Sequence, residues 1–365
     1  MTIYPSRDPR GTGSRGARGI DRRAFLRAGA VAVGAVGAGS ALAACGSSGS
    51  SPKSATGKSL TSINIINTDT TDTLAFQQIL QSKGWLEAYG VKASTTNVAD
   101  GVKATAAITS GSADIALMSG FGQIFPLIAK GEPLKLIGGT GQLANFEVWS
   151  AQPNIRTLSD LRGKTVGIGA VGALLDQVML AMFQQEGIDP STVTFVDIGS
   201  STNVFKAVVA KRIDAGLGSI GYAASEQKYG VHPVASVWKV LPNWVNQGSF
   251  TSAGAIQNKR EGLIGTLAAY DHLFRYLQGP DSESDFVNAY VTAGGTASVA
   301  KTLWNWYQQA RPFDIGITLS PALVTYMQKM NMLVKAQTSV LPYSKVTDMS
   351  LAQAAAKLAV TVPAS

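Results

Sequence analysis

The stretch from Leu158 to Leu174, Leu-Ser-Asp-Leu-Arg-Gly-Lys-Thr-Val-Gly-Ile-Gly-Ala-Val-Gly-Ala-Leu, decides which kind of α/β fold the chain adopts. An apolar strand pattern leads into Gly167, Gly169 and Gly172, and the pattern of a helix follows over residues 173–185. The three glycines match G-x-G-x-x-G. A glycine loop between a strand and a helix lets backbone N–H groups approach a ligand at the helix N-terminus.

One interpretation of this stretch is the dinucleotide site of an exported NAD(P)-dependent oxidoreductase. In that fingerprint an acidic residue about 20 positions further on holds the ribose. Asp197 ends the next apolar strand, residues 193–196, and lies 25 positions after Gly172. The match is therefore partial, and three spaced glycines are unremarkable in a chain that contains 39.

The second interpretation is a ligand cleft, and it rests on the residues before the glycines. Leu158-x-x-Leu161-x-Gly163-Lys164 resembles the entry to the second lobe of ABC-transporter solute-binding proteins, in the nitrate, sulfonate, taurine and thiamine-pyrimidine-precursor branch. Gly84-Trp-Leu-Glu-Ala-Tyr-Gly90 and Ser110-Gly-Ser-Ala-Asp-Ile-Ala116 resemble segments of the first lobe. The resemblance implies a periplasmic-binding-protein type II fold, an α/β fold of two lobes with two crossing strands as the hinge.

An internal repeat supports two lobes independently of the resemblance. Residues 107–119 align without gaps with residues 207–219, and each copy reads as a helix end, a turn and a short buried strand that finishes at a serine. Asp114 and Asp214 open the two strands, and we interpret both as structural turn formers.

The domain boundaries follow from these segments. We expect lobe one over residues 60–147 plus 255–345 and lobe two over residues 150–248. The first crossing is expected at residues 146–151 and the second near residues 248–256. Closure of the lobes around a small molecule follows from such a hinge.

The N-terminal residues read as an export signal and an anchor. Paired arginines at 22 and 23 and a weakly apolar run up to Ala44 are typical of a twin-arginine signal over residues 1–44. Leu42-Ala-Ala-Cys45 resembles a lipoprotein cleavage box, which makes Cys45 the lipidation residue. Residues 45–59 are rich in glycine and serine and read as a flexible tether. We expect a protein that is lipid-anchored at the extracytoplasmic face of the cell membrane.

The charge balance argues against nucleic acid as a partner. Residues 1–44 carry +5 of the chain's formal net charge of +8, which leaves +3 for the remainder. Nucleic-acid readers show clustered basic stripes instead. The expected partners are a small organic solute, an ABC permease with its ATPase, and the membrane through the lipid anchor, and we expect a monomer.

Ligands of open α/β sheets lie beyond the carboxyl ends of the strands, and the candidate binding residues follow from that rule. In the family, the loop after Gly169 meets the ligand at a helix N-terminus, and here it offers backbone donors and apolar side chains. A small, highly charged anion is therefore disfavoured, and we expect a ligand with an apolar or aromatic body. The candidates are Thr70, Thr71, Asp72, Ser119, Gly120, Gly172, Ala173, Leu174, Ser200, Ser201, Asn203, Ser219, Tyr222 and Trp244.

The sequence offers little for catalysis. Neither histidine has Cys, Asp or Glu neighbours at metal spacing, and no G-x-S-x-G or P-loop is present. Fungal enzymes that make the thiamine pyrimidine share this fold but carry a cysteine-rich motif, whereas Cys45 is the only cysteine here. We expect no enzyme activity, no metal and no cofactor. A ligand sensor on the same fold stays open as an alternative.

Overall fold

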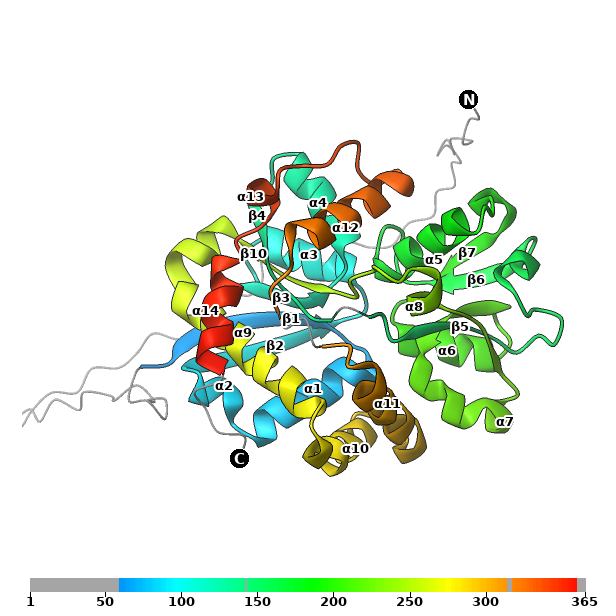
Figure 1. Cartoon of the computed structure of the whole chain (residues 1–365), viewed down its shortest axis with the longest axis horizontal. Helices are drawn as coiled ribbons and strands as arrows, with labels where there is room; N and C mark the ends of the chain where they lie inside the picture. The colour runs from blue at the N-terminus through cyan, green and yellow to red at the C-terminus, as the bar shows by residue number, and fades with distance from the viewer. Residues whose placement is uncertain (1–58, 142, 314–316, 360–365) are drawn as a thin grey trace, which may run out of the picture. The chain divides into compact units, whose positions relative to one another are not determined.

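The computed structural model describes residues 59–141, 143–313 and 317–359, all within one compact unit. The expected signal, Cys45 and all but the last residue of the expected tether lie outside the described residues. Two five-stranded sheets form the body, and Figure 1 shows the elements of the second sheet gathered in green around β5 to β9. The predicted two-lobed α/β organisation is confirmed.

The first sheet has the strand order β2-β1-β3-β10-β4, in which β10 runs antiparallel to both of its neighbours. The strands β1 and β2 are parallel over their whole length. Its strands are β1 (Thr61–Thr68), β2 (Val91–Val98), β3 (Ile115–Ser119), β4 (Leu134–Gly139) and β10 (Gly248–Ser252).

The second sheet repeats this plan with the order β7-β6-β8-β5-β9, and here β5 is the strand antiparallel to both neighbours. The repeated sequence segments place β3 and β8 at the centre of their sheets, so the two sheets correspond strand by strand. Its strands are β5 (Phe146–Ser150), β6 (Thr165–Ile168), β7 (Thr194–Asp197), β8 (Ala215–Ser219) and β9 (His232–Ser236).

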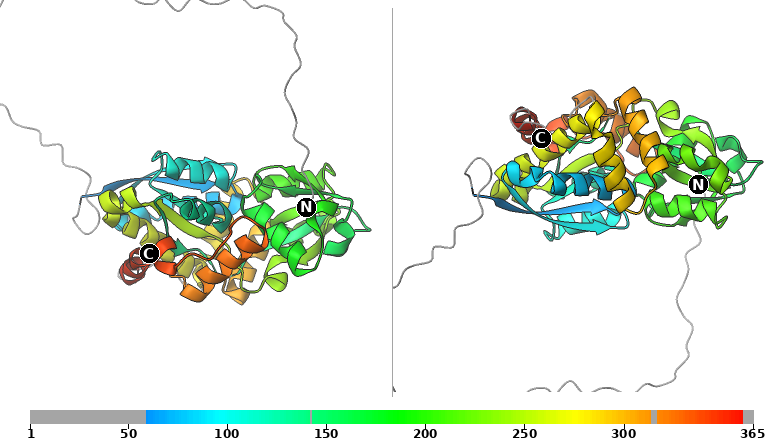
Figure 2. Two further views of the ribbon diagram at one scale, coloured as in Figure 1. Left: turned by 90° about the horizontal axis from the view of Figure 1, so that it is seen from above. Right: turned by 90° about the horizontal axis from the view of Figure 1, so that it is seen from below.

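Helices pack against both sheets, and Figure 2 shows from two further sides that the green elements stay grouped around the second sheet. With the first sheet, directly or through other helices, are α1 (Thr71–Ser82), α2 (Trp85–Ala88), α3 (Gly101–Thr109), α4 (Phe121–Ala129), α9 (Ala253–Leu277), α10 (Glu283–Thr292), α11 (Ala297–Ala310), α12 (Pro321–Leu333), α13 (Tyr343–Val346) and α14 (Ser350–Ala359). The helix α11 also packs on residues 220–225, next to the second sheet. With the second are α5 (Leu174–Gln185), α6 (Ser201–Val209), α7 (Glu226–Tyr229) and α8 (Val237–Val240). Short 3-10 turns are η1 (Leu158–Leu161), η2 (Pro190–Thr192), η3 (Ile220–Ser225) and η4 (Pro280–Ser282).

The chain passes between the sheets twice, after β4 and before β10. The strands expected at the crossings, β5 and β10, each lie inside one sheet, β5 in the second and β10 in the first. Residues 253–256, expected to continue the second crossing strand, instead begin α9, because Ser252 caps the helix by accepting a hydrogen bond from the Ala255 N–H. No helix of the described residues is both long and apolar enough to span a membrane.

The two repeat aspartates hold equivalent strands together. Asp114 Oδ2 accepts a hydrogen bond from the backbone N–H of Asn64 at 2.8 Å, and its carbonyl accepts one from Thr251 Oγ1. In the second sheet, Asp214 Oδ2 accepts from the backbone N–H of Thr165 at 2.8 Å, and its carbonyl accepts from Ser150 Oγ. Both carboxylates therefore hold neighbouring strands of a sheet together, which agrees with the prediction that they are structural residues.

The C-terminal helix α14 is anchored by one buried phenol. Tyr89 Oη donates to the Ala359 carbonyl at 3.0 Å and lies 2.9 Å from His272 Nδ1. We expect Tyr89→Phe to lower the free energy of unfolding by about 1 to 2 kcal/mol, because both partners lose a buried hydrogen bond. Urea unfolding measures the loss, and Tyr326→Phe, whose phenol has no hydrogen bond recorded within the described residues, serves as the control. An equal effect of the two variants would contradict the assignment.

Candidate functional site

Two adjoining cavities, of about 480 and 420 Å³ including open solvent, lie where the carboxyl ends of strands from both sheets meet. We call them together the cleft. Met118 lines both and has a φ of 52°, an uncommon backbone conformation for a residue with a side chain, which is often found at binding sites. The residues that line both cavities are Thr70, Met118, Phe146, Ser201 and Gln247.

Five helices begin at the cleft. The N-cap residues of α1, α3, α4, α5 and α6 all line one or both cavities, and they come from both lobes. A helix N-terminus presents unsatisfied N–H groups and the positive end of the helix dipole. These N-caps are Thr70, Asp100, Gly120, Ala173 and Ser200.

Acidic side chains already occupy three of these helix starts. Asp100 Oδ1 accepts from two N–H groups of α3, and Asp176 Oδ2 accepts from the Gly172 N–H at 2.7 Å in the first turn of α5. Asp72 lies in the first turn of α1. These carboxylates offset the positive helix ends, so the cleft as a whole is not strongly favourable to an anion.

The glycine fingerprint has a packing role in this structure. A Cβ on Gly167 would come within 2.4 Å of Ile213 Cδ1, which shows that the glycine lets strand β6 approach the core. Gly172 has a φ of 78°, which favours glycine there. Its N–H, a donor that a diphosphate would require, is bonded to Asp176. The dinucleotide interpretation therefore gains no support from this loop.

Asp72 is the carboxylate that faces the larger cavity. Asn145 Nδ2 donates to its Oδ2 at 2.8 Å, from the segment that links the two sheets. Burial raises the pKa of Asp72 to about 6, and hydrogen bonds from Asn145 and Tyr290 offset part of that effect. The Asp72 carboxylate is thus mostly ionised at neutral pH, and it takes up a proton when the pH falls through about 6.

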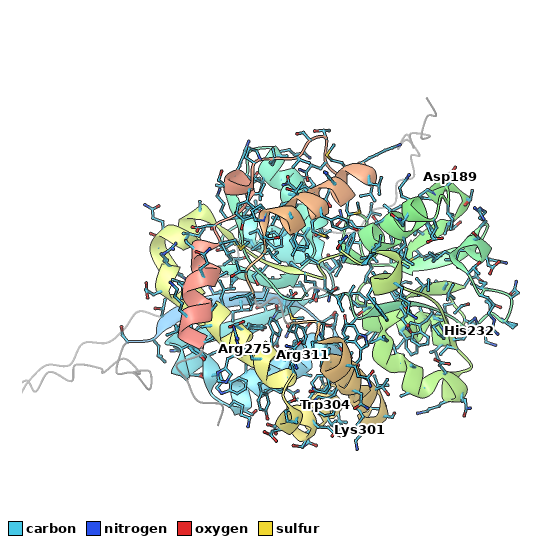
Figure 3. All side chains as sticks on the ribbon, in the orientation of Figure 1. Asp189, His232, Arg275, Lys301, Trp304 and Arg311 are labelled. Carbon is cyan, nitrogen blue, oxygen red and sulfur yellow. The ribbon has the colours of Figure 1, made fainter. Side chains whose placement is uncertain are left out.

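Aromatic and apolar side chains form a wall of the larger cavity. Phe313 is stacked on Phe274 with ring centroids 4.6 Å apart, which fixes its plane beside the cavity. Figure 3 labels Arg311, the residue that follows α11 and leads into this wall. The apolar and aromatic lining residues of the larger cavity are Phe76, Met118, Leu143, Phe146, Trp306, Tyr307, Pro312 and Phe313.

Half of the predicted binding residues line the cleft. These are Thr70, Asp72, Gly120, Ala173, Leu174, Ser200 and Ser201. Of these, Ser200 and Ser201 are more than nine-tenths buried, and no hydrogen bond of their side chains is recorded within the described residues. They are therefore available to a ligand.

The other predicted binding residues lie outside the two linings. Tyr222 is stacked face to face on Phe205 with centroids 3.7 Å apart, and Trp244 is 1% exposed, so both rings pack against the protein in this structure. Ser219 Oγ accepts a hydrogen bond from the Gly221 N–H. Ser119 is buried next to the lining residues Met118 and Gly120, whereas Thr71, Gly172 and Asn203 lie at the ends of the cleft helices without lining a cavity.

The sequence patterns did not reveal several lining residues. Asn145, Asn246 and Gln247 lie in the links between the sheets, where no periodicity marks them. Gln247 is 7% exposed, lines both cavities and has no side-chain hydrogen bond within the described residues. The sequence does hold one signal for them, because Asn145 and Gln247 are polar residues directly before the two expected crossing strands.

Direct contacts join the two lobes around the cleft. The hydroxyls of Thr71 and Thr202 lie 3.2 Å apart. Gln177 Nε2 on α5 donates to Asn331 Oδ1 on α12 at 3.1 Å, and both residues are buried. The same Gln177 amide fills the space where a Cβ on Gly122 would lie, 1.5 Å from its Nε2. The lobes are therefore closed on each other in this conformation.

Comparison with known proteins agrees with this architecture. Residues 76–240 match the family model described as NMT1/THI5 like. No curated protein matches the sequence.

Solved structures with the same fold are distant in sequence. A protein from Bordetella bronchiseptica RB50 is 16% identical, with a TM-score of 0.69, and the match covers 81% of this chain and 97% of that one. The alkanesulfonate-binding protein SsuA from Xanthomonas axonopodis pv. citri, bound to MOPS, is 16% identical with a TM-score of 0.63, covering 80% and 97%. The periplasmic nitrate-binding protein NrtA from Synechocystis PCC 6803 is 11% identical with a TM-score of 0.68, covering 84% and 92%. The predicted two-lobed periplasmic-binding-protein fold is confirmed.

Proposed function

Since the chain has the NMT1/THI5-like family segment on the two-lobed periplasmic-binding-protein type II fold, we propose that it is the substrate-binding component of an ABC importer. It captures a small organic solute outside the cell and delivers it to a permease with its ATPase. The observation that carries the proposal is the cleft, which five helix N-termini from both lobes surround.

Binding in this proposal is closure of two lobes over the solute. The links between the sheets contribute Asn145, Asn246 and Gln247 to the cleft, so a ligand there contacts the hinge as well as both lobes. The contact between Thr71 and Thr202 forms only when the lobes approach. A solute that bridges the lobes would therefore shift the population towards the closed form, because it binds that form more tightly.

The nature of the lining supports an organic solute with an apolar or aromatic body. Aromatic rings and apolar side chains form much of the larger cavity, while a few polar groups fix orientation, as in most small-molecule sites. Neither lining contains Lys, Arg or His among the described residues. A small inorganic anion would thus find no cationic side chain there.

The anchor and the partners complete the proposal. Cys45 would carry the lipid, and residues up to 59 would tether the body to the extracytoplasmic face of the membrane. Two or three acyl chains, at about 0.8 kcal/mol per buried CH₂, hold a protein firmly in a bilayer. We propose that the protein is a monomer that docks on the permease in its closed form. A receptor that reads the closed form would instead make it a sensor.

A thermal-shift screen separates solute binding from the dinucleotide alternative. We expect the melting temperature of the purified protein to rise with an organic solute that fills the cleft and to stay unchanged with NAD(P), because Asp176 occupies the Gly172 N–H. A shift with NAD(P) that disappears when Gly169 is replaced by a bulky residue would overturn the proposal and favour the oxidoreductase.

A further inference from the structure

Asp72 is a carboxylate in the cleft without a positive partner. Its two hydrogen-bond donors, Asn145 and Tyr290, are both neutral, and no ion pair of Asp72 occurs within the described residues. The cleft lining supplies no Lys, Arg or His among these residues. A carboxylate removed from water without a cation costs free energy, and the positive end of α1 offsets only part of that cost.

The acids at the starts of α3 and α5 bind the backbone of their own helix ends, whereas Asp72 accepts hydrogen bonds from side chains of other elements. Asp100 accepts two backbone N–H bonds and lies 3.9 Å from Lys103 Nζ, and Asp176 accepts the Gly172 N–H. Asp72 differs because its carboxylate lines the larger cavity, where the solute would lie. A solute in this cavity would therefore lie next to the Asp72 carboxylate.

The aromatic rings that line the cavity with Asp72 would also attract a positively charged solute. The larger cavity is lined by five aromatic side chains, and the negative face of an aromatic ring attracts an organic cation. Burial raises the pKa values of the phenols that act on Asp72 and keeps them neutral, so they do not supply the missing positive charge, although Tyr290 donates a hydrogen bond to the carboxylate. The lining rings are Phe76, Phe146, Trp306, Tyr307 and Phe313. The phenols are Tyr222, Tyr290 and Tyr307.

We propose that Asp72 is the counter-ion for a positively charged nitrogen group of the solute, so that the solute class is an organic cation, such as an amine or amidinium on an aromatic or apolar body. The inference rests on the proposed function, because it names the ligand class for the same cleft. Asn145 orients the carboxylate, and the aromatic wall holds the body of the solute.

Three flat molecules of nearly equal shape test the charge preference: benzamidinium, benzamide and benzoate. We expect the full-length protein at pH 8 to bind benzamidinium roughly tenfold to a hundredfold more tightly than benzamide, the range of a hydrogen bond to a charged group. Benzoate should bind least. Titration calorimetry with each of the three molecules gives the affinities.

Two variants assign the preference to one residue. Asp72→Asn should reduce the ratio of benzamidinium to benzamide affinity to about one, because the amide keeps the shape but not the charge. Asp197→Asn removes an exposed carboxylate that lines neither cavity, and it should leave the ratio unchanged. Thermal unfolding of both variants checks that each is folded.

The pH dependence gives a second readout. Burial raises the pKa of Asp72 to about 6, so lowering the pH through that value protonates the carboxylate, while benzamidinium keeps its charge. Benzamidinium affinity should therefore fall below about pH 6 in the wild type and stay flat in Asp72→Asn. Asn145 and the neutral phenols, Tyr222, Tyr290 and Tyr307, do not titrate in this range.

Preference for benzoate, no binding of benzamidinium, or a ratio that Asp72→Asn does not change would each overturn the inference. These results leave the proposed function intact if native mass spectrometry finds a neutral or anionic solute on the protein. Failure of the proposed function is a different result, in which no solute of any charge binds.

Discussion

Replacing Asp214 by alanine is expected to lower the free energy of unfolding by about 2 to 3 kcal/mol and to leave solute affinity unchanged. The side chain accepts hydrogen bonds from the backbone N–H and the hydroxyl of Thr165, both at 2.8 Å. A bond to a charged acceptor is worth about 1.5 kcal/mol at the low end of its range, and the partial exposure of Asp214 keeps the sum of the two bonds at or below about 3 kcal/mol. Alanine also leaves the Thr165 N–H without this partner. Asp214 precedes β8, at the end of the strand away from the cleft, so binding should not depend on it.

Urea unfolding and solute titration of the same samples check this prediction. Asp197→Ala is the matched control, because Asp197 is exposed at the end of β7 and has no side-chain hydrogen bond within the described residues. Its effect should stay within about 0.5 kcal/mol. A loss of affinity without a loss of stability in Asp214→Ala would show that the repeat aspartate serves the ligand instead of the sheet.

Gly122→Ala is expected to hinder lobe closure and to weaken solute binding by roughly twofold to tenfold. The added Cβ would lie 1.5 Å from Gln177 Nε2, so the Gln177 side chain must leave its place and lose its bond to Asn331. The overlapping atoms are the far end of a flexible side chain that can turn away, so the main cost is the lost hydrogen bond, about 0.5 to 1.5 kcal/mol, and it falls on the closed form. Small-angle scattering should show a larger radius of gyration than the wild type.

A second-site variant separates closure from general damage. Gly122→Ala combined with Gln177→Ala removes the overlap, so the radius of gyration should return towards the wild-type value, although the bond to Asn331 stays lost. If the single variant closes and binds like the wild type, Gly122 and Gln177 are not part of the closed interface.

The sequence predicted the two-sheet architecture well because short sequence segments determine its central strands. The repeat at 107–119 and 207–219 marks the central strands of the two sheets, and the aspartate in each copy bonds to the neighbouring parallel strand. The helix expected over residues 173–185 is α5, which begins one residue later. The expected lobe boundaries stay predictions. The two strands expected to cross between the lobes, β5 and β10, each lie within one sheet.

The site was predicted only in part because a cleft is assembled from distant segments. Residues next to strand ends, such as Ser200 and Ala173, follow from the rule for α/β sheets. Gln247 and Trp306 reach the cavity through the folding of the links and of the C-terminal helices, which no local pattern encodes. Trp244 stays a prediction as a ligand contact, although its side chain is buried and lines neither cavity.

Native mass spectrometry of the protein, purified without unfolding, tests the central claim most directly. If the protein is the solute-binding component of an importer, the spectrum should show a small organic molecule bound one to one, which is released on denaturation and identified from its mass. A bound NAD(P), or a protein that carries no solute and takes up none from a mixture of organic cations, neutral aromatics and anions, would contradict the account.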